Sequence, residues 1–237
     1  MKSEYLIITS KGITTAWKIA FILKLTIILS LSSRAQIFTD AALEGSSTLR
    51  SNLLQISGSY TVHGIIEKGD QTIVSNQFGI KAGIRITENF DLKLSFSRDA
   101  VSRSTDKAIL FQIAPKISVT DQTIAFYFPV SILSITADKE SINSGSDLFF
   151  IFSPRVILNI VQTDHFDLNV SPYLEVMKGN KSELYLTDGL CLGMGFTSNP
   201  DQWCLRTDIG IDLHSFIRAV VVPNLGLSLN VYLGNRK

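Results

Sequence analysis

The residues best suited to catalysis are Asp212 and His214, which lie two positions apart near the end of the chain. An aspartate at this spacing could orient the histidine so that its ring activates a water molecule. The chain contains no Asp-x-Asp sequence that could add a second acidic pair to this one. Neither a Gly-x-Ser-x-Gly nucleophile motif nor a glycine-rich phosphate loop occurs. We therefore expect a protein without enzymatic activity.

The other reactive side chains are those of Cys191 and Cys204. Neither has a second cysteine or a histidine at the spacing of metal ligands, so the sequence predicts neither a metal site nor a cofactor. Both fall on the same face of neighbouring predicted strands, but a turn near Asn199 would place them several residues out of opposition. A disulfide needs closely spaced Cα atoms, so we expect two reduced thiols, although an exported protein could form the bond.

Long strands must position these side chains, and residues 147–177 show them most clearly. Apolar side chains recur at every second position over 148–160 and 166–176, on either side of a polar turn at 162–165. The alternate positions of the second arm are polar: Asp167, Asn169, Ser171, Tyr173 and Glu175. This period of two indicates a β-hairpin with one apolar and one polar face. Its arms exceed the roughly 5–6 residues usual in soluble proteins and match the roughly 9–11 residues that cross a bilayer.

The same alternation predicts ten strands in all, with eight or twelve also compatible. The expected strands are residues 54–62, 78–86, 90–96, 109–119, 124–132, 148–160, 166–176, 184–196, 203–213 and 225–233. Short connections (87–89, 120–122, 162–165 and 197–201) alternate with longer, more charged ones (63–71, 98–107, 136–145 and 178–183). Transmembrane barrels have this layout, with the short turns in the periplasm. The predicted fold is therefore all-β, a closed antiparallel transmembrane β-barrel.

The last expected strand carries a further pattern, in which a polar residue and a glycine precede two spaced hydrophobic residues: Asn224, Gly226, Leu229 and Val231. With the alternation over residues 53–234, this pattern makes the chain similar to the small bacterial outer-membrane β-barrel proteins, a porin-like family. The resemblance implies that these four residues are the signal read by the barrel-assembly machinery. It also implies a location in the bacterial outer membrane, in contact with membrane lipid. The spacing of Asp212 and His214 is similar to that of ten-stranded outer-membrane proteases, which makes a protease the minor alternative.

The N-terminal region is expected to direct export. Residues 1–35 have the features of a cleaved signal peptide: a basic lead, an apolar core at 19–31 and small residues at 33 and 35. An uncleaved anchor helix is the alternative, but this apolar core is shorter than the roughly 20 residues that span a bilayer. We expect an N-terminal periplasmic extension at 36–52 and the barrel domain at 53–237. Cleavage would leave 17 basic and 20 acidic residues, a balance that offers no basic surface for nucleic acid.

The polar positions of the strands carry charges of both signs in similar numbers. The predicted lumen network consists of Lys81, Arg85, Lys93, Lys116, Arg155, Asp167, Glu175, Arg206, Asp208 and Asp212. Isolated buried charges are costly, so we expect these groups to pair with one another. A barrel of about eight strands can be filled by its own side chains, which favours a lumen plugged by charge. A narrow pore or a small-ligand cavity is the alternative.

Two functions compete on this sequence. The first is a non-enzymatic integral barrel with a structural, porin-like or surface-interaction role. The second is a soluble exported β-barrel that binds an apolar ligand, in which the apolar positions would face inward.

Four prolines fall inside expected strands: Pro115, Pro129, Pro154 and Pro172. A proline cannot donate to the ladder and is normally found at edges or bulges. The last three lie at similar heights above the short turns. We therefore predict a shared level at which these strands bulge or kink.

Overall fold

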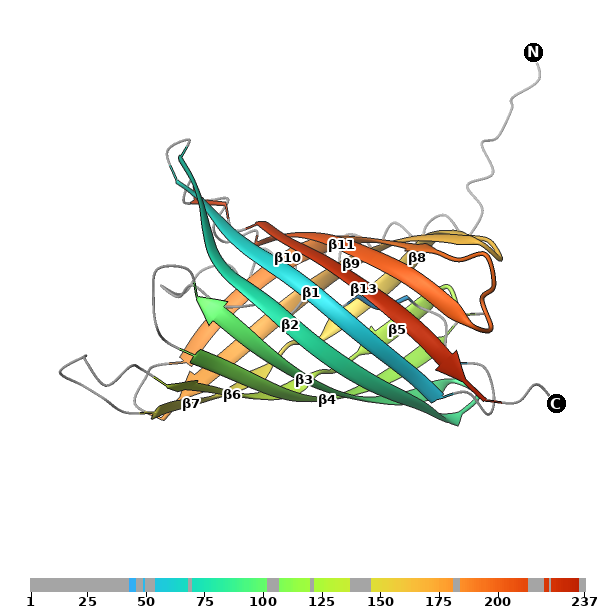
Figure 1. Ribbon diagram of the computed structural model, residues 1–237, viewed down its shortest axis with the longest axis horizontal. Helices are drawn as coiled ribbons and strands as arrows, with labels where there is room; N and C mark the ends of the chain where they lie inside the picture. Colours follow the sequence, from blue (N-terminus) through green and yellow to red (C-terminus); the bar gives the residue numbers. More distant parts are fainter. Residues whose placement is uncertain are drawn as a thin grey trace, which may run out of the picture.

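A single antiparallel sheet closes on itself in the computed structural model and forms a barrel of tilted strands (Figure 1). The structure describes residues 43–45, 49, 54–67, 70–101, 107–119, 122–136, 146–180, 184–212, 220–221 and 223–234. The strand segments in these residues are β1 (Leu54–Glu67), β2 (Asp70–Thr87), β3 (Phe90–Val101), β4 (Lys107–Val119), β5 (Ile124–Tyr127), β6 (Val130–Thr136), β7 (Ser146–Phe152), β8 (Arg155–Gln162), β9 (Phe166–Gly179), β10 (Leu184–Phe196), β11 (Trp203–Asp212), β12 (Val220–Val221) and β13 (Pro223–Leu233). The β9–β10 pairing closes the ring. Over the same ranges, no helix is long and apolar enough to cross a membrane.

These segments combine into ten spanning strands, as the alternation predicted. β5 and β6 pair with β4 in one register, so they are two halves of one strand. β7 and β8 are likewise the halves of the next strand, and both pair with β9. The short β12 extends the ladder at the end of β1. The strands follow one another around the barrel in chain order, so short connections suffice between neighbours.

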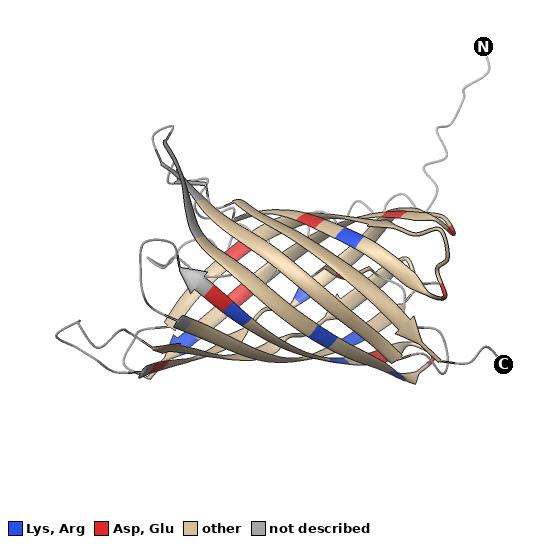
Figure 2. Cartoon of the chain, in the orientation of Figure 1, with Lys and Arg blue, Asp and Glu red and all other residues tan. Residues whose placement is uncertain are grey.

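The faces of the strands explain why this sequence forms a membrane barrel. Large apolar side chains at alternate positions point outward and are exposed, among them Phe78 (61%) and Ile80 (65%). Polar side chains at the intervening positions point into the lumen, where Gln77, Lys81 and Lys93 are buried. Charged residues are sparse along the strands (Figure 2). A soluble ligand-binding barrel would hold its apolar side chains inside, so the observed orientation contradicts that alternative.

The two rims of the barrel differ, but the long connection predicted at 63–71 is wrong, because only residues 68–69 separate β1 from β2. The β2–β3 connection spans residues 88–89, and Leu54 at the start of β1 pairs with Leu233 at the end of β13 on this same rim. At the opposite rim, β1 and β2 continue into the region expected to be a loop at 63–71, because their ladder runs on to the Glu67–Asp70 pair. A bulge between His63 and Gly64 accompanies this extension.

The prolines interrupt two neighbouring strands at one level but cause no bulge there. The breaks lie at residues 128–129 and 153–154, and the Ser153 amide donates to the Pro129 carbonyl at 3.0 Å. The pairing register is the same on both sides of each break. Pro172 lies inside the uninterrupted β9. The prediction of a shared level is therefore correct for two strands, whereas the predicted bulge is wrong.

The ladder keeps its register because proline lacks only a donor. The Pro115 carbonyl accepts from the Phe128 amide at 2.9 Å, and the Pro154 carbonyl accepts from the Leu174 amide at 3.1 Å. Each proline thus gives up one of two ladder bonds, and its neighbours hold the strands in place.

Part of the lumen wall is apolar, which the sequence analysis did not anticipate. Near the rim of the long loops, Leu110, Leu133, Ile151 and Met177 are buried against one another on the inner face. They come from β4, β6, β7 and β9, which lie next to one another in the barrel. This part of the interior is held by apolar packing rather than by ion pairs.

The outward face yields a first prediction. We expect Ile80→Arg to lower the free energy of unfolding by about 2–4 kcal/mol, because it places a charge in the middle of the lipid-exposed band. Leu233→Arg, at the end of β13, is the control and should cost about 0–1 kcal/mol, since the charge can reach the interface. Urea titration in lipid vesicles, followed by the mobility shift between folded and unfolded barrel, measures both. Equal costs at the two positions would contradict a depth-dependent lipid contact.

Candidate functional site

An N-terminal segment occupies the lumen. Of the range 36–52, the structure describes residues 43–45 and 49, and Leu43, Glu44 and Leu49 are all buried. The expectation that this range lies outside the barrel as a periplasmic extension is therefore wrong for these four residues. The causes are electrostatic and hydrophobic. Glu44 forms ion pairs with residues of the barrel wall, and Leu43 and Leu49 are removed from water.

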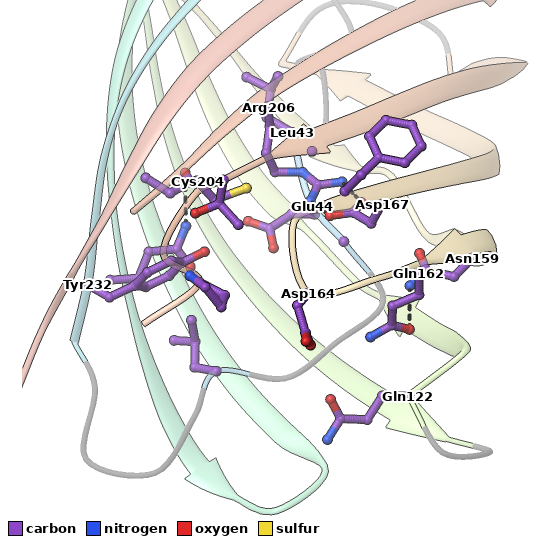
Figure 3. A pocket seen from close by; sticks show the side chains of 18 of the residues that line it. Leu43, Glu44, Gln122, Asn159, Gln162, Asp164, Asp167, Cys204, Arg206 and Tyr232 are labelled. Carbon is purple, nitrogen blue, oxygen red and sulfur yellow. Dashed lines mark hydrogen bonds and ion pairs between the residues drawn. The ribbon is translucent and has the colours of Figure 1, made fainter. Parts of the chain in front are cut away.

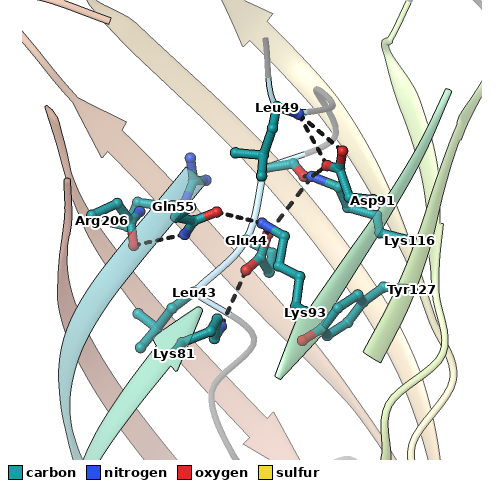
Figure 4. A network of polar contacts seen from close by, with 12 residues as sticks. Leu43, Glu44, Leu49, Gln55, Lys81, Asp91, Lys93, Lys116, Tyr127 and Arg206 are labelled. Carbon is teal, nitrogen blue, oxygen red and sulfur yellow. Dashed lines mark hydrogen bonds and ion pairs between the residues drawn. The ribbon is translucent and has the colours of Figure 1, made fainter. Parts of the chain in front are cut away.

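Three lysines of the barrel wall converge on the Glu44 carboxylate (Figure 4). Lys81 on β2 lies 3.1 Å from Oε1, while Lys93 on β3 and Lys116 on β4 lie 2.7 and 3.7 Å from Oε2. All four side chains are at most 7% exposed. We call these three lysines the lysine cradle. Since the ammonium groups are removed from water, they need a nearby anion, which Glu44 supplies.

Further contacts fix the segment on both sides of Glu44. The Leu43 amide donates to Asp208 Oδ2 at 2.6 Å, and the Leu49 amide donates to the Asp91 carboxylate at 3.0 and 3.2 Å. Asp91 also pairs with Lys116 at 3.2 Å. The segment is therefore tied to opposite sides of the lumen by backbone donors as well as by charge.

A second ion pair lies beside the segment. Arg206 on β11 holds Asp167 on β9 through two parallel hydrogen bonds of 2.8 Å each. Gly195 lies between these strands, and a Cβ there would clash with the Asp167 carboxylate and lie 2.7 Å from Arg206 Nη1. A Cβ on Gly45 would lie 3.0 Å from the same nitrogen. Glycine at both positions therefore leaves room for the bidentate pair.

A cavity of about 330 Å³ opens beside the segment toward the short turns (Figure 3). Its walls include Gln122, Gln162 and His165, from the turn regions. Glu44, Lys93, Lys116 and Arg206 line it where the segment lies. The lysine cradle is thus at the inner end of a space that begins at the short-turn rim.

The ten residues predicted to form one lumen network fall into several groups. The structure brings Lys81, Lys93 and Lys116 together, and it pairs Asp167 with Arg206. Elsewhere in the lumen, Glu175 accepts from the Ser153 hydroxyl at 2.8 Å.

Two further members of the predicted network, Arg155 and Arg85, make other contacts. The Arg155 guanidinium stacks 5.0 Å from the Tyr173 ring and lies 3.9 Å from the Cys191 sulfur. Arg85 is half-exposed and donates to the Thr87 carbonyl near the short-turn rim. The side chain of Asp212 lies outside the described residues.

The anion held by the lysine cradle, Glu44, is not among the residues predicted for the lumen network. Glu44 lies in a weakly patterned polar stretch, so no periodicity marks it. The available signal was the row of lysines on the polar positions of three consecutive strands, at 81, 93 and 116. Such a row needs an anion from elsewhere in the chain.

The candidate reactive residues show no catalytic arrangement in the part of the chain that is described. His214 lies outside it, so the Asp212–His214 pair remains a sequence prediction. Both cysteines are free and buried. Within the described ranges, no group of three or more histidine, cysteine or acidic side chains could hold a metal ion.

The four residues of the predicted assembly signal all lie on β13. Asn224 is buried in the lumen, whereas Leu229 and Val231 are exposed on the outer face, at 48% and 38%. Gly226 pairs with Thr61 of β1. Their recognition by the assembly machinery remains a prediction.

The close approach at Gly195 yields a second prediction. We expect Gly195→Val to lower the free energy of unfolding by about 1–3 kcal/mol, because the new side chain displaces Asp167 and Arg206. Gly58→Val is the matched control, since nothing lies within 4 Å of a Cβ at that position. The control should be neutral or slightly stabilising, as it adds an apolar side chain to the lipid face. Urea unfolding of both variants measures the difference, and equal losses would show that room for the ion pair is not what requires the glycine.

Comparison with known proteins bears on the fold. No protein-family model matches the chain, and no curated protein sequence matches it. An outer-membrane channel from Pseudomonas putida F1 has a similar structure, with 10% identity and a TM-score of 0.51 over 83% of this chain and 100% of that one. The translocator domain of the autotransporter NalP from Neisseria meningitidis is 8% identical, with a TM-score of 0.43 over 92% and 97% of the two chains. The NanC porin is 9% identical, with a TM-score of 0.43 over 76% and 100%.

At such low identities a structural likeness speaks only to the fold, and the channel with the TM-score of 0.51 carries the comparison. The ten spanning strands, the outward apolar band and the polar lumen agree with it. The chain has the fold of the small bacterial outer-membrane β-barrel proteins.

Proposed function

We propose that the protein is a non-enzymatic, porin-like barrel of the outer membrane whose lumen is closed by its own N-terminal segment. The observation that carries the proposal is the burial of Glu44 among Lys81, Lys93 and Lys116. A ten-stranded barrel is slightly wider than the roughly eight-stranded barrels whose interior side chains can fill, so its lumen has room for a chain segment. A chain segment tied to the wall by buried ion pairs and amide donors adds a plug to this interior.

The cavity supports a closed channel rather than a solid structural barrel. It opens at the short-turn rim and reaches Glu44 and Arg206. A barrel with only a structural role would gain nothing from lysines whose anion must come from a segment outside the strands. The plug is therefore the element whose movement would change the state of the lumen.

The envelope location and the partners form part of the same proposal. The exposed apolar band fits outer-membrane lipid as the surrounding partner. Residues 1–35 would direct export and be cleaved. Asn224, Gly226, Leu229 and Val231 would present the chain to the barrel-assembly machinery.

Conductance in a planar lipid bilayer tests the proposal. We expect the wild-type protein to show little steady conductance and Glu44→Lys to conduct, because a fourth ammonium group repels the segment from the lysine cradle. Glu88→Lys makes the same charge change in the exposed β2–β3 turn and should remain closed. Equal conductance of the wild-type protein and Glu44→Lys would overturn the proposal.

A further inference from the structure

The lysine cradle has the geometry of a binding site that is filled by the chain itself. Lys81 contacts one carboxylate oxygen of Glu44, and Lys93 and Lys116 contact the other. We propose that Glu44 occupies a carboxylate-binding site, and that the cradle binds a solute carboxylate when the Glu44 side chain is withdrawn. This inference rests on the proposed function, in which the segment closes the lumen.

The charge balance of the lumen supports an anionic ligand. Asp91 contacts Lys116 at 3.2 Å and stays beside the cradle when Glu44 is withdrawn. Arg206 is already neutralised by Asp167. Asp208 faces the same region and holds the Leu43 amide, so it adds one opposing charge. The cradle brings three ammonium groups together in a narrow space with low-dielectric walls, an arrangement that concentrates anions.

The cavity gives a solute access to the cradle. Lys93 and Lys116 both line it, although Glu44 covers part of their surface. Arg85 also lines the cavity from the short-turn side and adds a positive charge on the way in. A solute anion can therefore approach the cradle from the short-turn rim.

The contacts favour a carboxylate over other anions. Both oxygens of one planar group are used, one by a single ammonium and the other by two. The side-chain amide oxygen Oε1 of Gln55 accepts a hydrogen bond from the Lys93 ammonium at 2.7 Å. This contact helps to hold the Lys93 ammonium beside the Glu44 carboxylate. Asp91 and Gln55 Oε1 beside the cradle are acceptors, so additional oxygens of a larger anion placed against them would be repelled.

Citrate is a suitable probe, with Glu44→Ala as the variant that empties the cradle. At millimolar concentration and matched ionic strength, citrate should raise the urea midpoint of unfolding of Glu44→Ala, by an amount that grows with the logarithm of its concentration. Citrate should have little effect on the wild-type protein. The control combines Glu44→Ala with Lys81→Gln, Lys93→Gln and Lys116→Gln, which should abolish the citrate effect.

The same variants in a planar bilayer separate this inference from the proposed function. We expect Glu44→Ala to pass chloride over potassium by about tenfold and to be blocked by citrate added on the short-turn side. If Glu44→Ala conducts without chloride selectivity and citrate does not shift its urea midpoint, the carboxylate site is overturned. The proposal that the segment closes the lumen would still stand. If citrate raises the urea midpoint of Glu44→Ala but this variant does not conduct, the carboxylate site is supported. The proposal that the N-terminal segment closes a channel would then be contradicted.

Two further outcomes would overturn the inference in solution. Equal stabilisation of the wild-type protein and Glu44→Ala by citrate would indicate a nonspecific salt effect. Equal stabilisation of Glu44→Ala by sulfate and citrate would show that the cradle does not select carboxylates.

Discussion

Glu44→Lys is expected to make Cys191 reactive toward a membrane-impermeant maleimide, with a rate increase on the order of a hundredfold. Losing one partner of a buried ion pair costs about 3–5 kcal/mol, and about 3 kcal/mol changes an equilibrium by roughly a hundredfold. The segment would then leave the lumen for a larger fraction of the time. Cys191 is 2% exposed and does not line the cavity in the described structure, so it reports on this opening.

The two cysteines of the chain allow an internal comparison. Cys204 lines the cavity and should react whether or not the segment is in place. Cys204→Ser leaves Cys191 as the sole thiol, and Cys191→Ser provides the reciprocal background. Mass spectrometry of labelled protein in lipid vesicles gives the rates.

The charge change needs its own control. Glu88→Lys should leave the labelling of Cys191 at the wild-type rate, because Glu88 is exposed in a turn. Folding of each variant is checked by its mobility shift on heating. Rapid labelling of Cys191 in the wild-type protein, or an unreactive but folded Glu44→Lys, would show that the segment does not control access to the lumen.

Arg206→Met is expected to lower the free energy of unfolding by about 3 kcal/mol, at the low end of the range for breaking a buried ion pair. The guanidinium is 6% exposed, but its partner Asp167 is 22% exposed and can recover some hydration. Loss of the arginine also removes one of the cations near Asp208, which holds the Leu43 amide, and leaves Arg155 and Lys81 to balance that carboxylate. We expect Arg206→Lys to recover part of the loss, since a lysine restores the charge without the two parallel hydrogen bonds.

A double-mutant cycle isolates the pair from these other effects. Asp167→Leu and Arg206→Met, alone and combined, should show a coupling of about 1–3 kcal/mol in urea unfolding. Residues in direct contact are expected to be non-additive, whereas independent sites add. Additive losses would mean that the two parallel hydrogen bonds contribute no net stability.

The barrel itself follows closely from the sequence. Alternation with a period of two places side chains on opposite faces of a strand whatever surrounds it, so the apolar positions near Phe78 and Ile80 already define a lipid face. The number of alternating stretches gives about ten spanning strands. Short connections between them indicate which strands are neighbours. These features are local, which is why they can be read without a structure.

The sequence does not predict which prolines interrupt their strands. Pro129 and Pro172 both fall inside expected strands, yet the first interrupts its strand and the second does not. A proline removes one donor in either case, so its effect depends on the bonds that neighbouring strands still make. The apolar cluster around Leu133 and Met177 was missed for a related reason, because it forms only when four strands meet in the lumen.

The sequence by itself determined a barrel of about ten strands, the solvent on each face of its strands and the presence of charges in its lumen. Only the tertiary structure decided which charges meet. Lys81, Lys93 and Lys116 come from three strands, and Glu44 comes from a stretch without periodicity. Burial of an ammonium group is compensated by whichever anion the fold brings near, and this depends on contacts between residues far apart in the chain. The plug is therefore a property of the closed barrel rather than of any segment in it.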